Sequence, residues 1–355
     1  MTAQDDTART MKPANPSRRV ILAGTAAVAA GAALAPPVAA AISHAGPGAD
    51  MLDRVNRWLD SLNGEQRAAA TFDFDSSRRQ RYNYMLGGAF APGLPLERMT
   101  APQKDLALDV VATGLSAEGM ETAKNIMLQQ DILRDEWGKG RSDRNSERFS
   151  LMIFGNPSET SPWGWRFEGH HLTMTVTLVG TEVVSHTPKS FSSEPNTVPS
   201  GPFVGLVVLP ENEALGRALY ADLSPANRQA ATISERSVGN VTAMAGRENL
   251  TRPREGVALG DLTPGQADMA RRLIDLYTTD HLSAELADAQ RQRIDGNDLS
   301  AARFAWAGPN VEDESLYYRL HGDTFFIEFA TLRRQPQHHH TIVHDLSRNL
   351  GRHAL

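Results

Sequence analysis

The sequence predicts an α+β fold made of two similar halves, each with helices followed by a small antiparallel sheet. Two observations carry this prediction. Helix-start motifs recur at matched spacings in the two parts of the chain, and each set precedes short runs rich in β-branched and aromatic residues. The halves span about 50–210 and 211–345. This pattern indicates an internal duplication, with a site near a pseudo-twofold axis between the halves.

The helix-start motif occurs four times, beginning at Leu62, Met99, Leu223 and Leu262. Each copy has an apolar residue, a capping residue, two spacers and then an amide or similar residue. A capping Asn, Ser or Thr accepts a hydrogen bond from a free backbone N–H, and Pro fits the first helical position. Any helical protein repeats its caps. Here, however, the first two copies lie 37 residues apart and the last two 39 residues apart, which favours duplication.

Apolar periodicity predicts the remaining elements in chain order. Helices are expected at 51–62, 65–70, 102–113, 117–134, 211–221, 225–235, 265–280 and 283–294. Strands are expected at 148–154, 164–168, 170–179, 203–209, 302–306, 316–320, 324–330 and 339–344. The segment 187–202 is rich in Pro and Ser, which predicts an exposed loop or lid.

The composition narrows the function classes. The chain has 355 residues, 41% of them hydrophobic, which is enough to bury a core. Its net charge of −6 argues against a nucleic-acid-binding protein, whose surface is usually basic. There is no cysteine, so thiolate metal sites, disulfides and Cys nucleophiles are excluded. A bound metal ion would need ligands from His, Asp, Glu or backbone oxygen.

The N-terminal segment, 1–41, reads as an export signal. Arg18 and Arg19 precede an Ala- and Gly-rich apolar stretch, and Val38–Ala41 resembles a cleavage site. The apolar stretch is too short for a good membrane anchor. We expect the twin-arginine machinery to export a folded protein, and residues 42–355 to form one compact periplasmic or secreted domain. No membrane contact is expected after cleavage.

Alternation along the predicted strands selects candidate site residues. On 324–330, Glu328 interrupts an aromatic run, and a buried carboxylate is costly unless it is paired or bound to a cation. His171 projects with the threonines of its strand, and His170 lies at the edge of the apolar face. If the strand predicted at 339–344 begins one residue earlier, His338 and His340 point to one side of it and His339 to the other. A His-x-His pair on a strand suits one metal ion.

We therefore predict a mononuclear metal site formed by His170, His171, His338 and His340, with Glu328 as the catalytic residue. Nitrogen-rich ligands suit Cu, Zn or Fe rather than Ca or Mg. A solvated histidine run and a histidine packed in the core are the plain alternatives. Several weak signals agree here: two histidine clusters, one buried carboxylate and an export route used by proteins that fold before transport.

At these residues the chain resembles the domain-of-unknown-function 3500 family. The resemblance rests on Trp165–Leu172, on Tyr318–Gly322 leading to Glu328, and on the histidine-rich end. It covers nearly the whole mature chain and implies a shared fold and site, but no particular reaction. The two histidines of the family's terminal motif fall on His338 and His340. At three positions where the family has Asn, Arg and Asp, this chain has Gln337, His344 and Ala330.

These observations predict an exported metalloenzyme that acts on a small extracellular molecule. An oxidoreductase with one copper ion is favoured, because the ligands are mainly histidines and the export route suits cofactor proteins. Zinc or iron stays open. With zinc, a metal-bound water would hydrolyse the substrate and Glu328 would act as the base instead of as a ligand. A non-catalytic metal or small-ligand binding protein is the other alternative.

Overall fold

The computed structural model describes residues 46–85, 92–135, 144–246 and 250–355. The predicted export signal lies outside these residues. Contacts between residues group His44–Leu355 into one compact unit. In the ranges described, no helix is both long and apolar enough to cross a membrane.

The described residues contain eight α-helices. They are α1 (Pro47–Ser61), α2 (Gly64–Ala70), α3 (Ala101–Gly114), α4 (Ala117–Asp135), α5 (Asn212–Asp222), α6 (Pro225–Ala231), α7 (Pro264–Thr278) and α8 (Ala284–Asp295). Short 3-10 helices lie at Ser77–Gln80, Leu96–Arg98, Leu259–Asp261, Leu299–Ala301 and Asn349–Gly351.

Thirteen strands of the described part form one mixed sheet. They are β1 (Thr71–Phe72), β2 (Leu94–Pro95), β3 (Ser150–Gly155), β4 (Pro162–Gly169), β5 (Leu172–Val179), β6 (Glu182–Ser185), β7 (Lys189–Phe191), β8 (Thr232–Ser234), β9 (Val257–Ala258), β10 (Arg303–Ala307), β11 (Tyr317–His321), β12 (Phe325–Leu332) and β13 (Gln335–Asp345). The strand order is β1-β3-β4-β5-β7-β13-β12-β11-β10-β8, with β2, β6 and β9 attached to β3, β5 and β10.

The mixed class of helices and strands is therefore confirmed, and the two predicted sets of strands join into one mixed sheet in place of purely antiparallel ones. Strand β7 joins the two sets of strands, because it pairs with β5 on one side and with β13 on the other. The two ends of the sheet are connected in the same way. β1 runs parallel to β3 and β8 parallel to β10, while β2 and β9 pair antiparallel with the same two strands.

The predicted helix starts are present. Asn63, Thr100 and Thr263 each form a capping box with the glutamine three residues later, and Ser224 accepts a hydrogen bond from the N–H of Asn227. One predicted helix is too long. The segment 225–235 leaves the helix after Ala231, because Thr232–Ser234 pairs with β10 as strand β8.

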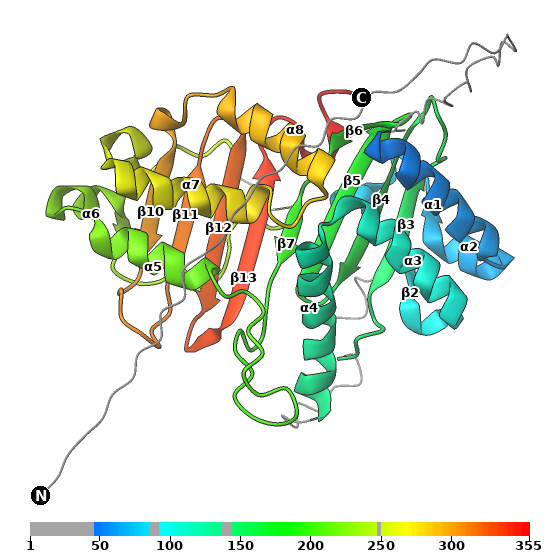
Figure 1. The fold of residues 1–355 in the computed structure, drawn as a ribbon, viewed down its shortest axis with the longest axis horizontal. Coiled ribbons are helices and arrows are strands. Elements are labelled where there is room, and N and C mark those ends of the chain that lie inside the picture. Colours follow the sequence, from blue (N-terminus) through cyan, green and yellow to red (C-terminus); the bar gives the residue numbers. More distant parts are fainter. Residues whose placement is uncertain (1–45, 86–91, 136–143, 247–249) are drawn as a thin grey trace, which may run out of the picture. The chain divides into compact units, whose positions relative to one another are not determined.

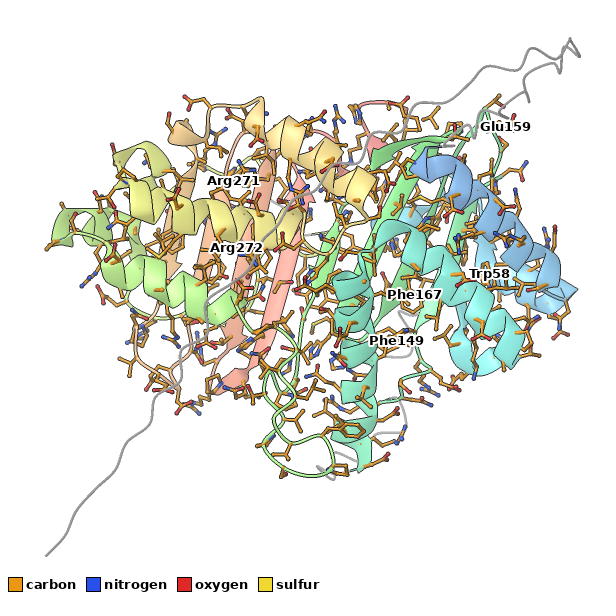
Figure 2. All side chains as sticks on the ribbon, viewed as in Figure 1. Trp58, Phe149, Glu159, Phe167, Arg271 and Arg272 are labelled. Carbon is orange, nitrogen blue, oxygen red and sulfur yellow. The ribbon has the colours of Figure 1, made fainter. Side chains whose placement is uncertain are left out.

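Helices α1, α3, α4, α5, α7 and α8 lie over one face of the sheet (Figure 1). Under α1, α3 and α4 the core includes Trp58, Phe149 and Phe167, whose side chains are fully or almost fully buried (Figure 2). A second core lies under α5 and α7. A third, smaller cluster packs loop residues such as Tyr82, Tyr84 and Ala243 against Phe326, Ala330 and Ile342 of the sheet.

The predictions for two neighbouring segments are also wrong. The apolar run 203–209 is not a strand, since Gly201 and Gly205 adopt positive φ angles of 85° and 87° and Val204 is 65% exposed. The segment 187–202 is largely enclosed rather than exposed. Ser192 and Ser193 are fully buried, and the N–H of Ser193 donates to the carbonyl of His339 at 2.9 Å. This segment passes beside β13, where the metal site was predicted.

Candidate metal centre

His171 reaches the site from the turn between β4 and β5. Its backbone has a φ of 69°, a left-handed conformation that is uncommon for a residue with a side chain. Two backbone hydrogen bonds hold it there. Its N–H donates to the carbonyl of Tyr84 at 2.8 Å, and its carbonyl accepts from the N–H of Ser192 at 2.8 Å. The side chain is fully buried.

His338 and His340 come from β13, where alternate residues share a face. His340 is opposite Ala330 of β12, and His339 between them is opposite Thr331. The predicted separation of His338 and His340 from His339 is therefore present. Their rings lie edge-on to the ring of His171, with centroids 4.8 and 5.1 Å away. One strand and one distant turn thus meet at a single point.

The three Nε2 atoms lie close to one another. Nε2 of His338 is 3.0 Å from Nε2 of His171 and 3.0 Å from Nε2 of His340, and the third distance is 3.3 Å. Two nitrogens bound about 2.0–2.1 Å from one tetrahedral ion would be roughly 3.3 Å apart. The three side chains are therefore spaced as ligands of one metal ion, and they could hold one.

Neighbouring amide oxygens fix which ring nitrogen carries hydrogen. Nδ1 of His340 lies 2.8 Å from Oδ1 of Asn240, and Nδ1 of His338 lies 3.1 Å from Oε1 of Gln335. An amide oxygen only accepts, so each Nδ1 is the donor. The Nε2 lone pairs then face the shared point. Metal-binding histidines are usually oriented by such outer hydrogen bonds.

The cluster favours neutral imidazoles. Burial lowers the pKa of His171 well below its usual range, and the neighbouring rings of His170, His340 and His338 lower it further. Burial, followed by the charges of His338 and His170, has the same effect on the pKa of His340. A neutral imidazole is the form that binds metal, so protonation does not compete strongly near neutral pH.

His170 lies beside this triad but outside it. Its ring stacks on that of His171 at 3.7 Å between centroids, and its Nδ1 is 2.6 Å from Oε1 of Gln130. With His171 and Glu194 it forms a second group whose ligand atoms lie within 4.8 Å of one another. Of the four histidines predicted as ligands, the structure therefore places three in one group and the fourth in an adjoining group.

Glu328 is placed in a separate polar cluster of the same region. Its carboxylate accepts hydrogen bonds from the backbone N–H groups of Thr242 and Ala243 at 3.0 and 2.7 Å. It also accepts from the hydroxyls of Thr242 and Tyr317, each at 2.6 Å. Glu328 is fully buried and is not in either histidine group. Tyr84 connects the two regions. Its ring packs on His340 at 5.2 Å, and burial and the charge of Glu328 raise its pKa.

The remaining histidines of the run have other partners. His339 points to the opposite side of β13, where its Nε2 lies 3.0 Å from Oε2 of Glu213. His344 lies 2.7 Å from the carbonyl of Ala243 and 2.6 Å from Nδ2 of Asn349. Neither belongs to a group of side chains that could hold a metal in the described part of the chain.

Sequence reasoning missed the residues that surround the triad. Asn240 and Glu194 lie in segments with no periodic pattern, about 100 and 145 residues before His340. The only signal was local: Glu194 precedes Pro195 in a segment with many turn-forming residues, and that signal predicted exposure. Instead, Glu194 is 5% exposed, with Oε1 3.5 Å from Nδ1 of His338.

A family model described as protein of unknown function (DUF3500) matches residues 44–352. The chain belongs to this family. The resemblance inferred from the motifs around His171 and His340 is therefore confirmed. The DUF3500 match includes all three histidines of the triad and the residues that orient them. No curated protein and no solved structure matches the chain.

Proposed function

We propose that this DUF3500 protein is a metalloprotein that binds one transition-metal ion through Nε2 of His171, His338 and His340. One observation carries the proposal. The three Nε2 atoms lie 3.0–3.3 Å apart, and two of the three rings are held by amide oxygens in the tautomer that leaves Nε2 free. Because both of those rings carry hydrogen on Nδ1, the Nε2 lone pairs of His338 and His340 face each other 3.0 Å apart in a largely buried site.

We propose further that the centre is catalytic. Catalytic zinc sites keep three protein ligands and leave one position for water or substrate, whereas structural sites are closed by four. The triad has three histidines and no carboxylate among its members. The side chain of His338 is 13% exposed, so this member of the triad lies nearest to the surface. A small molecule is the substrate that such a site could admit.

Copper is the ion that we favour. Imidazole nitrogen suits Cu, Zn, Fe and Ni, and divalent copper binds a given nitrogen site most tightly among these metals. With copper, the expected reaction is oxidation of a small molecule. Zinc and hydrolysis are the second candidate, supported by the open three-histidine arrangement. Glu328 gives little support to that candidate as a base, because its oxygens already accept four hydrogen bonds.

We also propose that the protein works outside the cytoplasm after twin-arginine export. Support comes from Arg18, Arg19 and the apolar stretch that follows them.

We propose as well that the two sets of strands arose by internal duplication and that the metal site lies between them. Its support is the matched pairing of Arg166 with Thr175 and of Arg319 with Glu328, 153 residues later. The triad lies close to where the two sets of strands meet, since β13 pairs with β7.

Metal analysis of protein made without a histidine tag tests the proposal. We expect about one equivalent of metal, and copper in an oxidised sample should give an electron paramagnetic resonance signal. The double variant His338→Ala, His340→Ala should retain less than about a tenth of an equivalent. His339→Ala is the matched control, because His339 points away from the triad. Wild-type protein with no metal, or a double variant with full metal, would contradict the proposal.

A further inference from the structure

Arg144 has buried donors that nothing in the described chain satisfies. Its side chain is 10% exposed, and its Nη2 lies 3.3 Å from Oε2 of Glu194. Nε and Nη1 are buried and have no hydrogen-bond partner among the described residues. Buried polar groups in proteins are nearly always paired, and an unpaired group calls for an explanation. A guanidinium stays charged in proteins, so it cannot remove the problem by losing a proton.

The guanidinium of Arg144 lies beside the metal centre. Its partner Glu194 has its other carboxylate oxygen 3.5 Å from Nδ1 of His338, and it shares a group of ligand-like atoms with His170 and His171. The guanidinium of Arg144 is therefore separated from a ring of the triad by a single carboxylate group.

The charges around the triad favour an anion. An imidazole binds a metal ion in its neutral form and adds no charge, so a divalent ion held by three imidazoles keeps its full charge. The carboxylate of Glu194 supplies one negative charge, which is less than the combined positive charge of the divalent ion and Arg144. Arginine is the side chain best suited to carboxylate and phosphate oxygens, because its planar donors match their geometry. A ligand oxyanion would supply the acceptors that Nε and Nη1 lack.

We propose that the metal centre takes a small anionic substrate, a carboxylate in the first place, and that Arg144 binds its anionic group. This inference rests on the proposed metal site and adds the substrate class to it. Arg144 selects the substrate and positions it, and it need not contact the reacting atom. The plain alternative is that Arg144 only forms an ion pair with Glu194 to close the segment around Pro195.

Calorimetric titration of metal-loaded protein with acetate, and with neutral acetamide of nearly the same shape, tests the inference. Acetate should bind, and acetamide should bind at least about tenfold more weakly. Inorganic phosphate forms a further arm that separates carboxylates from oxyanions in general. Arg144→Gln should weaken acetate binding at least about tenfold, with metal content unchanged. Arg144→Lys keeps the charge without the planar donors. Its affinity for acetate should lie between those of wild type and Arg144→Gln.

Arg148→Gln is the matched control. Arg148 lies on the same segment, but its side chain is 41% exposed and pairs with Glu97. It should bind acetate within about twofold of wild type. Far-ultraviolet circular dichroism and metal content report whether Arg144→Gln folds, and Arg144→Lys decides the case if it does not. Equal affinity for acetate and acetamide, or unchanged acetate affinity in both Arg144 variants, would overturn the inference.

Failure of the metal site gives a different result. If the protein takes up no metal, the proposed function fails, and the same titration of metal-free protein then decides the role of Arg144. We expect weaker acetate binding there that still depends on Arg144. Metal-free protein in which acetate binding is absent or independent of Arg144 would reject the anion site as well.

Discussion

At the scale of single residues, the site depends on groups that orient the histidines. Asn240 is the clearest case, because its Oδ1 lies 2.8 Å from Nδ1 of His340 and holds that nitrogen as the donor. Removing this oxygen frees the ring to rotate and to change tautomer. Asn240→Ala should therefore weaken metal binding about 10- to 100-fold, measured by competition with a chelator of known affinity.

Asn310→Ala provides the comparison for Asn240→Ala. Asn310 lies in the exposed turn between β10 and β11, where its side chain bonds only to Arg217. Metal affinity should not change in that variant. If Asn240→Ala also leaves the affinity unchanged, the tautomer of His340 is set by the ion itself, and the hydrogen bond adds little.

The sequence predicts the three clustered histidines better than their surroundings. His338 and His340 follow from alternation along one strand, which is a local property. His171 was expected on the next strand, but it lies in the turn before β5 with a φ of 69°. Asn240, Glu194 and Arg144 come from irregular segments, and only the tertiary fold brings them to the histidines. Glu328 shows the limit of the argument from burial cost. The sequence predicts that a buried carboxylate needs partners, but it does not say that backbone N–H groups and Tyr317 supply them.

At the scale of elements, long periodic segments were predicted well and short strands were not. Helices α3, α4 and α7 and strands β5, β12 and β13 begin and end within a few residues of their predicted bounds. The strands β1, β2, β7, β8 and β9 have two or three residues each. So few residues carry no readable period, and their pairing depends on neighbours far away in the chain. Because β7 is so short, the sequence does not reveal how the two sets of strands join into one sheet.

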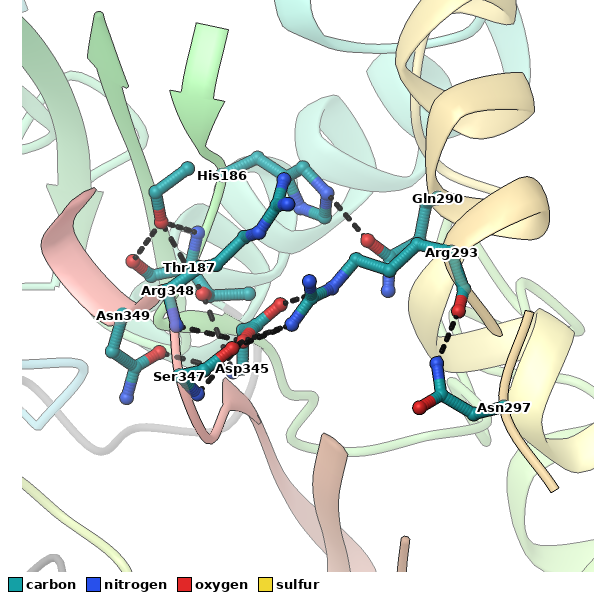
Figure 3. Close-up of polar contacts among 10 residues, drawn as sticks. His186, Thr187, Gln290, Arg293, Asn297, Asp345, Ser347, Arg348 and Asn349 are labelled. Carbon is teal, nitrogen blue, oxygen red and sulfur yellow. Dashed lines mark hydrogen bonds and ion pairs between the residues drawn. The ribbon is translucent and has the colours of Figure 1, made fainter. Parts of the chain in front are cut away.

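An ion pair joins helix α8 to the end of β13. Nε and Nη2 of Arg293 each lie 3.0 Å from an oxygen of Asp345, with side chains 18% and 8% exposed (Figure 3). Arg293→Met should lower the free energy of unfolding by about 1–3 kcal/mol, because it leaves a largely buried carboxylate without its cation. Backbone N–H groups of Ser347 and Arg348 still bond Asp345, which limits the loss. Denaturant unfolding measures it.

The same helix offers a control. Arg291 pairs with Asp288, but these side chains are 45% and 67% exposed. An exposed pair of this kind contributes about 0.5 kcal/mol or less, so Arg291→Met should hardly change the unfolding midpoint. Equal losses for the two variants would mean that α8 is held by its apolar contacts and not by Asp345.

At the scale of the whole molecule, buried histidines make the fold sensitive to acid. Burial is the main cause that lowers the pKa of His186 and His344 to about 4 and that of His281 to about 3. An unfolded histidine has a pKa near 6.5. Below pH 6.5 these histidines therefore bind protons in the unfolded chain but stay neutral in the folded chain. The stability from these groups is present above pH 6.5 and is lost as the pH falls toward 4.

One carboxyl group acts in the opposite direction. Burial raises the pKa of Glu168 to about 7, so the folded state takes up this proton first, and Glu168 adds stability as the pH falls from 7 toward its ordinary value. His171, His321 and His340 also have lowered pKa values, so the described histidines outnumber this one carboxyl group and acid leaves a net loss. Each extra proton bound by the unfolded chain changes the free energy of unfolding by about 1.4 kcal/mol per pH unit.

Metal-free protein should therefore lose stability steeply between pH 6.5 and pH 4.5, as measured by denaturant unfolding at several pH values. Metal-free protein is required, because release of the ion from protonated histidines would add a second cause. His186→Gln can keep a hydrogen bond to Gln290, whose Oε1 lies 3.2 Å from the histidine ring, and it removes one titrating group. The unfolding free energy of this variant should change less steeply with pH than that of wild type, by up to the contribution of one proton. An unfolding free energy independent of pH in this range would show that water reaches these histidines in the folded state, since only exclusion from water keeps their pKa values low.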